Sequence, residues 1–148
     1  ATCCEIGALS ASEDPALATN MRDYGEHIGI AFQIRDDLLD FLGKESTIGK
    51  PVGGDLKEKK FTLPLIYAFT QAPVKTRRGI LRLVKNGIKR GEIQQVVTFV
   101  RDYGGIDYAE GRAHEYRRLA MDNLAVLPAS KYKTALEQFT NFVVERAK

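Results

Sequence analysis

Three carboxylates on one predicted helix are the clearest chemical signal in the chain. Asp36, Asp37 and Asp40 lie within nine residues of Phe32. Asp36 and Asp40 are four residues apart, so a helix places them on one face, where like charges repel by a few tenths of a kcal/mol. A bound cation would relieve that repulsion. Hard carboxylate oxygens suit Mg²⁺, which prefers six oxygen ligands and usually shares them with phosphates. We therefore interpret the three aspartates as a magnesium site.

An amide and several lysines complete a predicted diphosphate site. Gln33 lies three residues before the first aspartate, on the same side of the helix, where its amide can donate to a phosphate. Lys50 and Lys60 follow in a glycine-bearing segment, with two more lysines between them. Magnesium on one side and ammonium groups on the other would neutralise a leaving diphosphate. The alternative is an ordinary solvated acidic face beside solvated loop lysines, and the segment lacks the spacing of a P-loop.

The elements that position these residues are predicted to be helical almost throughout. Apolar residues recur with the 3.6-residue period, no alternating strand pattern appears, and the fold class is therefore all-α. A polar loop is expected over about 43–59. A first short helix is expected to end near residue 11. Further helices are expected over about 15–42, 63–70, 74–87, 91–103, 107–127 and 130–147.

Apolar stripes on these helices predict the core. The long helix is expected to bury Ile28, Phe32, Leu38 or Leu39, and Phe41 or Leu42. The helix over 91–103 is expected to bury Ile93, Val96, Val97, Val100 and Tyr103. The last helix is expected to bury Tyr132, Ala135, Leu136, Phe139, Phe142 and Val143. Gly25 and Gly29, four residues apart, could let another helix approach closely.

Composition excludes several classes of function. The net charge is only +3, and the basic residues are interpreted as spread among acidic ones, which argues against nucleic-acid binding. No apolar run reaches the roughly 18 residues of a membrane span. Cys3 and Cys4 are adjacent and predicted to be free thiols, which fits a reducing cytoplasm. His27 and His114 are isolated and predicted to be neither ligands nor bases.

One stretch of the sequence resembles a known family. The stretch comprises Phe32-Gln33-x-x-Asp36-Asp37-x-x-Asp40, then Gly49-Lys50, then Gly54-Asp55-Leu56, then Lys60-x-Thr62-Leu63-Pro64. Its order and spacing resemble the second aspartate-rich region of the trans-isoprenyl diphosphate synthases. The likeness is softer elsewhere but extends over essentially the whole chain.

The resemblance implies an activity and a metal. Such enzymes join isopentenyl diphosphate to an allylic diphosphate, head to tail, with three Mg²⁺ ions. It implies that Asp36 is the chief metal ligand of this region, and that Asp37 and Asp40 hold metal-bound waters or lysine partners.

The resemblance also implies roles for the amide and the lysines. Gln33 and Lys50 match positions that bind the allylic diphosphate, so Lys50 joins Asp36 as a candidate catalytic residue. Lys60 matches a second lysine near the diphosphate.

The family pattern has parts that this sequence lacks. The first aspartate-rich region, which binds the other two Mg²⁺ ions, is not in the chain, and the chain opens without Met inside a helical pattern. Residues 1–148 are thus expected to be the C-terminal portion of one all-α domain of the isoprenoid synthase type, inactive alone. The parent is expected to be a medium- or long-chain polyprenyl diphosphate synthase, cytoplasmic and homodimeric. The alternatives are a non-catalytic subunit of a heteromeric synthase and a helical interaction module without metal.

Overall fold

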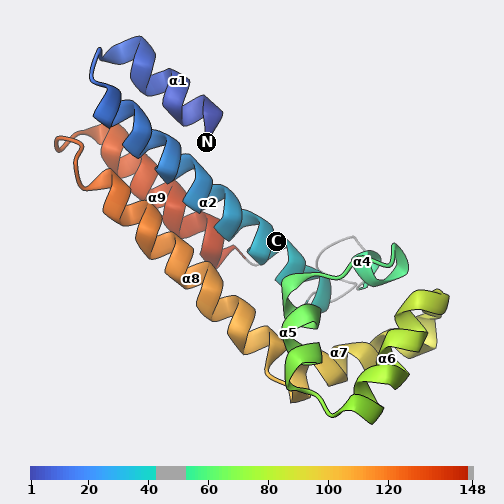
Figure 1. Cartoon of the computed structure of the whole chain (residues 1–148). Helices are drawn as coiled ribbons and strands as arrows, with labels where there is room; N and C mark the ends of the chain where they lie inside the picture. Colours follow the sequence, from blue (N-terminus) through green and yellow to red (C-terminus); the bar gives the residue numbers. More distant parts are fainter. Residues whose placement is uncertain (43–52, 147–148) are drawn as a thin grey trace. The chain divides into compact units, whose positions relative to one another are not determined.

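The computed structural model describes residues 1–42 and 53–146, and over these ranges the chain is all-α with no strand. This confirms the predicted fold class (Figure 1). The helices are α1 (Thr2–Ala11), α2 (Pro15–Leu42), α4 (Gly54–Lys57), α5 (Leu63–Gln71), α6 (Val74–Asn86), α7 (Arg90–Asp102), α8 (Gly105–Leu124) and α9 (Lys131–Glu145). None of the helices in these two ranges combines the length and apolar content needed to cross a bilayer.

The segment predicted as a loop over 43–59 includes a short helix that the sequence analysis did not predict. Residues 43–52 lie outside the described ranges, but Gly54–Lys57 form the short helix α4. Gly53 takes the left-handed conformation at its N-terminus (φ 81°), which costs a glycine little. A Cβ at Gly53 would also lie 2.8 Å from the Ile93 side chain. Periodicity cannot reveal a single turn of helix that depends on one glycine and a distant partner.

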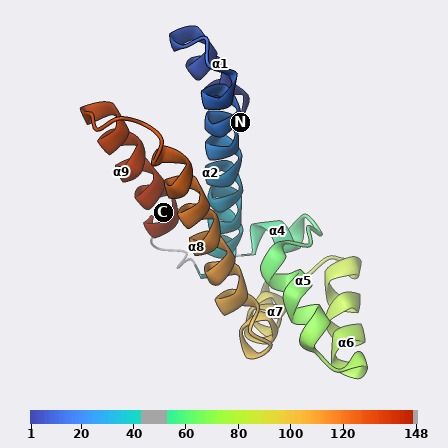
Figure 2. The same cartoon turned by 60° about the vertical axis from the view of Figure 1, so that its left-hand side comes forward.

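The helices divide into two compact units, and the first comprises Ala1–Arg35 and Arg112–Ala147. Here α2, α8 and α9 run side by side (Figures 1 and 2). Tyr24 of α2 is buried, and its hydroxyl lies 3.1 Å from the Thr140 hydroxyl of α9. Asn20 of α2 and Asn123 of α8 exchange two hydrogen bonds, at 2.7 and 2.9 Å. The Asn123 amide oxygen also lies 2.8 Å from Nδ1 of His27, so this histidine is a packed residue.

Burial in the first unit corrects two predictions for apolar side chains. On α9 the buried residues are Thr140, Val143 and Val144, not the whole predicted stripe. Its aromatic residues are exposed: Tyr132 by 70%, Phe139 by 51% and Phe142 by 61%. On α2, Phe32 is 41% exposed, and the Arg146 guanidinium lies over its ring at 3.9 Å. The apolar arc of each helix is wider than the surface that its neighbours cover.

The glycine prediction for the first unit is half correct. A Cβ at Gly25 would lie 2.7 Å from the backbone nitrogen of Ala1, so the start of α1 approaches α2 there. Nothing lies within 4 Å of the corresponding position at Gly29.

The second unit contains Asp36–Gly111. In it α7 packs against both α5 and α6. Four of the five predicted core residues of this helix are buried, namely Ile93, Val96, Val97 and Val100, and Leu56, Leu65, Ile80 and Val84 join them. Tyr103, which follows the last residue of α7, is only partly buried. Helix α8 begins at Gly105, two residues earlier than predicted, where a Cβ would collide with the Pro64 carbonyl oxygen. The absence of a side chain at this glycine lets α8 start directly against α5.

Candidate metal and diphosphate site

Asp36, Asp37 and Asp40 lie in the last two turns of α2, which ends at Leu42. The C-terminus of a helix carries partial negative charge, so a carboxylate there is disfavoured by about 0.3–1 kcal/mol. The last turn of α2 contains no basic residue that would offset this. Two of the three carboxylates, Asp37 and Asp40, accept hydrogen bonds from segments outside α2.

Asp40 finds its partners in the backbone of α4. Its Oδ1 accepts the N–H of Gly54 at 2.9 Å, and its Oδ2 accepts the N–H of Asp55 at 3.1 Å. Its backbone carbonyl accepts the N–H of Gly53 at 3.1 Å. Partial burial raises the pKa of Asp40, while the two N–H donors act in the opposite direction. Asp40 thus fixes the segment that follows Gly53 to the end of α2.

Asp37 is half-buried beside other carboxylates. The pKa of Asp37 is raised to about 6, chiefly by burial and next by the negative charge of Asp55. The charges of Asp36 and Asp40 contribute less, and a hydrogen bond from the Leu63 backbone lowers the pKa. Crowded carboxylates with a raised pKa are the environment that a divalent cation would stabilise.

Asp36, Asp37, Asp40 and Asp55 influence one another electrostatically, and we call them the acidic cluster. Through Asp55 this cluster contacts a predicted diphosphate-binding lysine. Lys60 Nζ lies 3.3 Å from Asp55 Oδ1 and 2.7 Å from Glu58 Oε2. The hydrogen bond to Glu58 is the largest cause that raises the pKa of Lys60, followed by the hydrogen bond to Asp55. Lys60 therefore lies at the acidic cluster, but its ammonium is engaged by carboxylates of its own chain.

Of the remaining predicted site residues, the structure describes Asp36 and Gln33 but not Lys50. Asp36 is exposed at the end of α2. Gln33 is also exposed, one turn earlier on the same helix, in the part of α2 that belongs to the first unit. Lys50 lies outside the described residues, so its predicted role is not addressed by the structure.

A metal site of three converging carboxylates is not formed as the side chains stand. Within residues 1–42 and 53–146, no group of three or more His, Cys, Asp or Glu side chains is arranged to hold a metal ion. Instead, both oxygens of Asp40 accept backbone N–H groups, and Asp37 accepts one from Leu63. The roles predicted for Asp37 and Asp40 at a metal stay predictions.

The sequence analysis assigned no role to the two acidic residues that pair with Lys60, namely Asp55 and Glu58. Both precede Lys60 closely in the sequence, by five and two residues. Opposite charges at that separation in a turn are a usable signal for an ion pair. The N–H donors of Gly54 and Leu63 carry no such signal, because any non-proline residue can donate from its backbone.

The fold and the site together define an all-helical protein with an acidic cluster of hard oxygen donors beside a lysine. The chain belongs to the polyprenyl synthetase family, whose sequence model matches residues 1–100.

Two curated relatives give the extent of this likeness. The chain is 36% identical over 142 residues to the short chain isoprenyl diphosphate synthase of Methanothermobacter thermautotrophicus, covering 96% of this chain and 43% of the relative. It is 35% identical to the octaprenyl diphosphate synthase of Haemophilus influenzae, with the same two coverages. The chain thus spans less than half the length of these relatives.

Solved structures show the same fold. The polyprenyl synthase of Caulobacter crescentus, solved in complex with calcium and isoprenyl diphosphate, matches with a TM-score of 0.88 and 33% identity. The match covers 97% of this chain and 44% of that one. The geranylgeranyl pyrophosphate synthase of Bacteroides thetaiotaomicron matches with a TM-score of 0.86 and 35% identity, over 97% of this chain and 48% of that chain.

Proposed function

We propose that this chain forms part of a prenyltransferase that joins isopentenyl diphosphate to an allylic diphosphate. In that reaction the allylic carbon–oxygen bond breaks and the diphosphate leaves with the electron pair. The alkene of isopentenyl diphosphate then forms the new carbon–carbon bond, and a proton is lost. Membership of the polyprenyl synthetase family carries the proposal, and the acidic cluster at the end of α2 supports it.

We propose Mg²⁺ as the cation, held chiefly by Asp36. The cluster fits such an ion, because its donors are carboxylate oxygens and their crowding raises the pKa of Asp37 to about 6. Mg²⁺ typically binds through one or two carboxylates together with waters and substrate phosphates, so three converging aspartates are not required. When bound, the cation would stabilise the charge of the leaving diphosphate. A relative solved with calcium and isoprenyl diphosphate supports a divalent cation.

The other residues of the site hold and orient the substrate in this proposal. Lys50 and Gln33 bind the allylic diphosphate. Lys60 contacts the oxygens of the diphosphate once its ion pairs with Asp55 and Glu58 open. Asp40 positions α4, and through it Asp55, by its two hydrogen bonds to backbone N–H groups.

We further propose that residues 1–148 alone do not complete the reaction. The chain spans about 43% of the length of each of the two curated relatives described above. Binding of the diphosphate from both sides is proposed to need a second metal-binding region that this sequence lacks. We propose a homodimeric parent, and its cytoplasmic location stays a prediction. A heteromeric synthase is the second candidate, favoured by 27% identity to heptaprenyl diphosphate synthase component 2 of Bacillus subtilis.

The test measures joint uptake of Mg²⁺ and inorganic diphosphate by the chain, by calorimetry and ³¹P NMR. We expect diphosphate binding to require Mg²⁺ and to weaken at least about tenfold in Asp36→Asn, because a carboxylate ligand is lost. Asp102→Asn, which neutralises an exposed aspartate on α7, should bind like the wild type. Equal binding by the two variants would overturn the assignment of Asp36.

Product formation is measured separately with isopentenyl diphosphate and geranyl diphosphate. The chain alone should form no new carbon–carbon bond. Measured condensation by these 148 residues would contradict the proposal that a further part of the family fold is needed. Light scattering with multi-angle detection, on the chain and on any longer form of the protein, separates the homodimer from the heteromer.

A further inference from the structure

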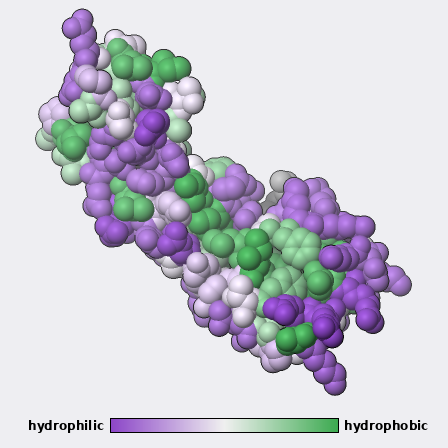
Figure 3. All heavy atoms as spheres, in the orientation of Figure 1, coloured by the Kyte–Doolittle hydropathy of each residue, from purple (hydrophilic) through white to green (hydrophobic). Residues whose placement is uncertain are grey.

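Positive charge is concentrated in one segment of the second unit. Residues 59–91 contain nine Lys and Arg and no Asp or Glu. The interpretation that basic residues are spread among acidic ones is therefore wrong for this segment. Helix α6 lies at its centre, and Figure 3 shows hydrophilic side chains over α6 at the lower right of the view.

Four of these cations form a row along α6, which we call the basic ridge: Lys75, Arg78, Arg82 and Lys85. Their spacing of three, four and three residues places them on one helix face. All four are exposed, whereas Ile80 and Val84, on the opposite face, are buried. The ridge spans eleven residues, from Lys75 to Lys85, or about 15 Å of helix.

Within residues 1–42 and 53–146, no acidic side chain neutralises the basic ridge. No carboxylate in residues 1–42 or 53–146 forms an ion pair with any of its four cations. Other exposed cations are paired in the ordinary way, such as Arg118 with Asp122 at 2.8 Å. Four adjacent unpaired cations repel one another, so an external anion is the partner that they fit.

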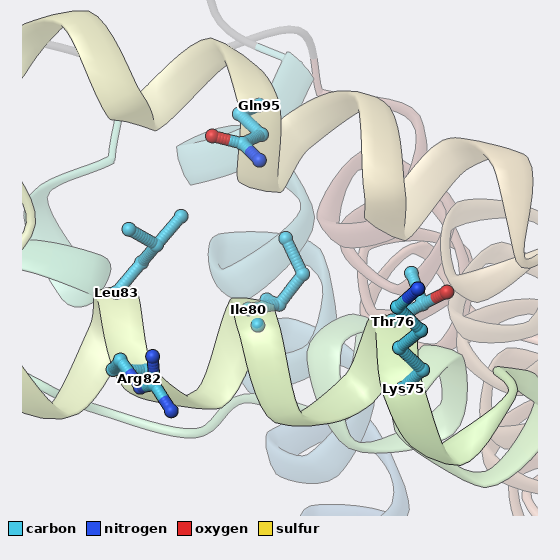
Figure 4. Close-up of a pocket in the computed structure, with 7 residues that line it drawn as sticks. Lys75, Thr76, Ile80, Arg82, Leu83 and Gln95 are labelled. Carbon is cyan, nitrogen blue, oxygen red and sulfur yellow. The ribbon is translucent and has the colours of Figure 1, made fainter.

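An open groove beside the ridge adds apolar surface. It has a volume of about 510 Å³ and lies between α6 and α7. Figure 4 shows Ile80 and Leu83 rising from α6 toward α7, with Gln95 of α7 above them. Lys75 and Arg82 of the ridge also line it. The groove is thus lined by two apolar side chains, Ile80 and Leu83, together with polar groups and the cations Lys75 and Arg82. This mixture matches an amphiphile with an anionic head.

We propose that the basic ridge docks this protein onto an anionic lipid bilayer. A straight row of cations on a convex helix suits a surface of many phosphates better than a single small anion. Helix α6 contains no aromatic residue on which a nucleic-acid base could stack, and it presents Val74, 52% exposed, at its first turn. Clusters of Lys and Arg of this kind bind anionic headgroups, each cation strengthening binding about fivefold.

The choice of a bilayer rests in part on the proposed function. A polyprenyl diphosphate has an anionic head and a long apolar tail, so the product would itself partition into a membrane. Vesicle binding by α6 and joint uptake of Mg²⁺ and diphosphate at Asp36 are separate measurements, so either proposal can fail while the other holds.

The test is flotation of the chain with phosphatidylcholine vesicles, with and without about one-third phosphatidylglycerol. We expect binding only to the anionic vesicles, weakening as salt is raised. The ridge variant carries Lys75→Gln, Arg78→Gln, Arg82→Gln and Lys85→Gln. Its matched control carries the same four-charge change at exposed cations elsewhere: Arg22→Gln, Arg101→Gln, Arg118→Gln and Lys131→Gln.

The ridge variant should bind anionic vesicles several hundredfold more weakly than the control, on the order of fivefold for each of the four cations removed. Circular dichroism should show both variants folded, because all eight positions are exposed. Asp36→Asn should bind vesicles like the wild type. Equal loss in the two quadruple variants, equal binding to neutral vesicles, or tighter binding to a homopolymeric RNA than to anionic vesicles would each overturn the proposal.

Discussion

The carboxylate of Asp40 accepts the backbone N–H of Gly54 at 2.9 Å, across fourteen residues of sequence. The third aspartate of the acidic run therefore binds a part of its own chain. This contact links the end of α2 to the start of α4 and fixes where Asp55 lies.

Removing that carboxylate should loosen α4. Asp40→Ala leaves two backbone N–H groups without their acceptors, and we expect a loss of about 1–3 kcal/mol in the free energy of unfolding. Hydrogen exchange at Gly54 and Asp55 should accelerate, which two-dimensional NMR measures directly. Asp102→Ala, at an exposed aspartate, should stay within about 0.5 kcal/mol of the wild type. Unchanged exchange at both amides would contradict the assigned role of Asp40.

The raised pKa of Asp37 predicts a dependence of stability on pH. The folded-state pKa of about 6 lies above the ordinary aspartate value of 3.8, so the folded chain holds more protons than the unfolded chain between these values. Stability from this group is therefore present below about pH 4 and is lost as the pH rises toward 6 and beyond.

Asp37→Asn should remove this dependence. Because Asp37 is only half-buried, solvent screening reduces the effect, and the variant should gain about 1 kcal/mol relative to the wild type between pH 4 and pH 7. Urea unfolding at both pH values measures the difference. A constant difference between the two proteins across this range would contradict the raised pKa.

Two glycines of α8 should respond in opposite directions to alanine. Gly105→Ala places a Cβ against the Pro64 carbonyl and 2.9 Å from Val100, so we expect a loss of about 2 kcal/mol or more. Gly111→Ala, where nothing lies within 4 Å, should gain about 0.5–1 kcal/mol from higher helix propensity. Thermal and urea unfolding compare the two variants, and similar stabilities would contradict the close packing of α8 on α5.

The buried pair of Tyr24 and Thr140 should be energetically coupled. Their hydroxyls are 3.1 Å apart, and Thr140 also donates to the Leu136 carbonyl at 2.8 Å. Tyr24→Phe should cost about 0.5–1.5 kcal/mol. A double-mutant cycle with Thr140→Val should give a coupling of at least about 0.5 kcal/mol, and additive effects would show that the hydrogen bond contributes nothing.

The long helices could be predicted because their ends carry local signals. Pro15 begins α2 and Gly87 follows α6, and both boundaries agree with the prediction within one residue. The short helix α4 could not be found this way. It depends on the left-handed Gly53 and on a carboxylate from another helix, and neither contact leaves a periodic pattern.

Periodicity also did not determine how much of a helix face is covered. It placed Tyr132, Phe139 and Phe142 on one apolar side of α9, but α2 and α8 cover a neighbouring part of that helix. The site shows the same division between local and distant information. Spacing predicted the aspartates of α2, whereas the partners of Asp40 and Asp37 are backbone groups of segments far along the chain.

The pairing of Lys60 with Asp55 and Glu58 means that the site has an internal competitor for each of its proposed ligands. An anion that binds the Lys60 ammonium, as proposed, would have to displace both carboxylates, and their negative charge would then be available to attract a cation. Binding of either ion would therefore raise the affinity of the site for the other ion, and the two affinities must rise by the same factor. If Lys60 binds the diphosphate as proposed, its ion pairs would weaken the binding of phosphate alone or of metal alone and would favour the binding of both together.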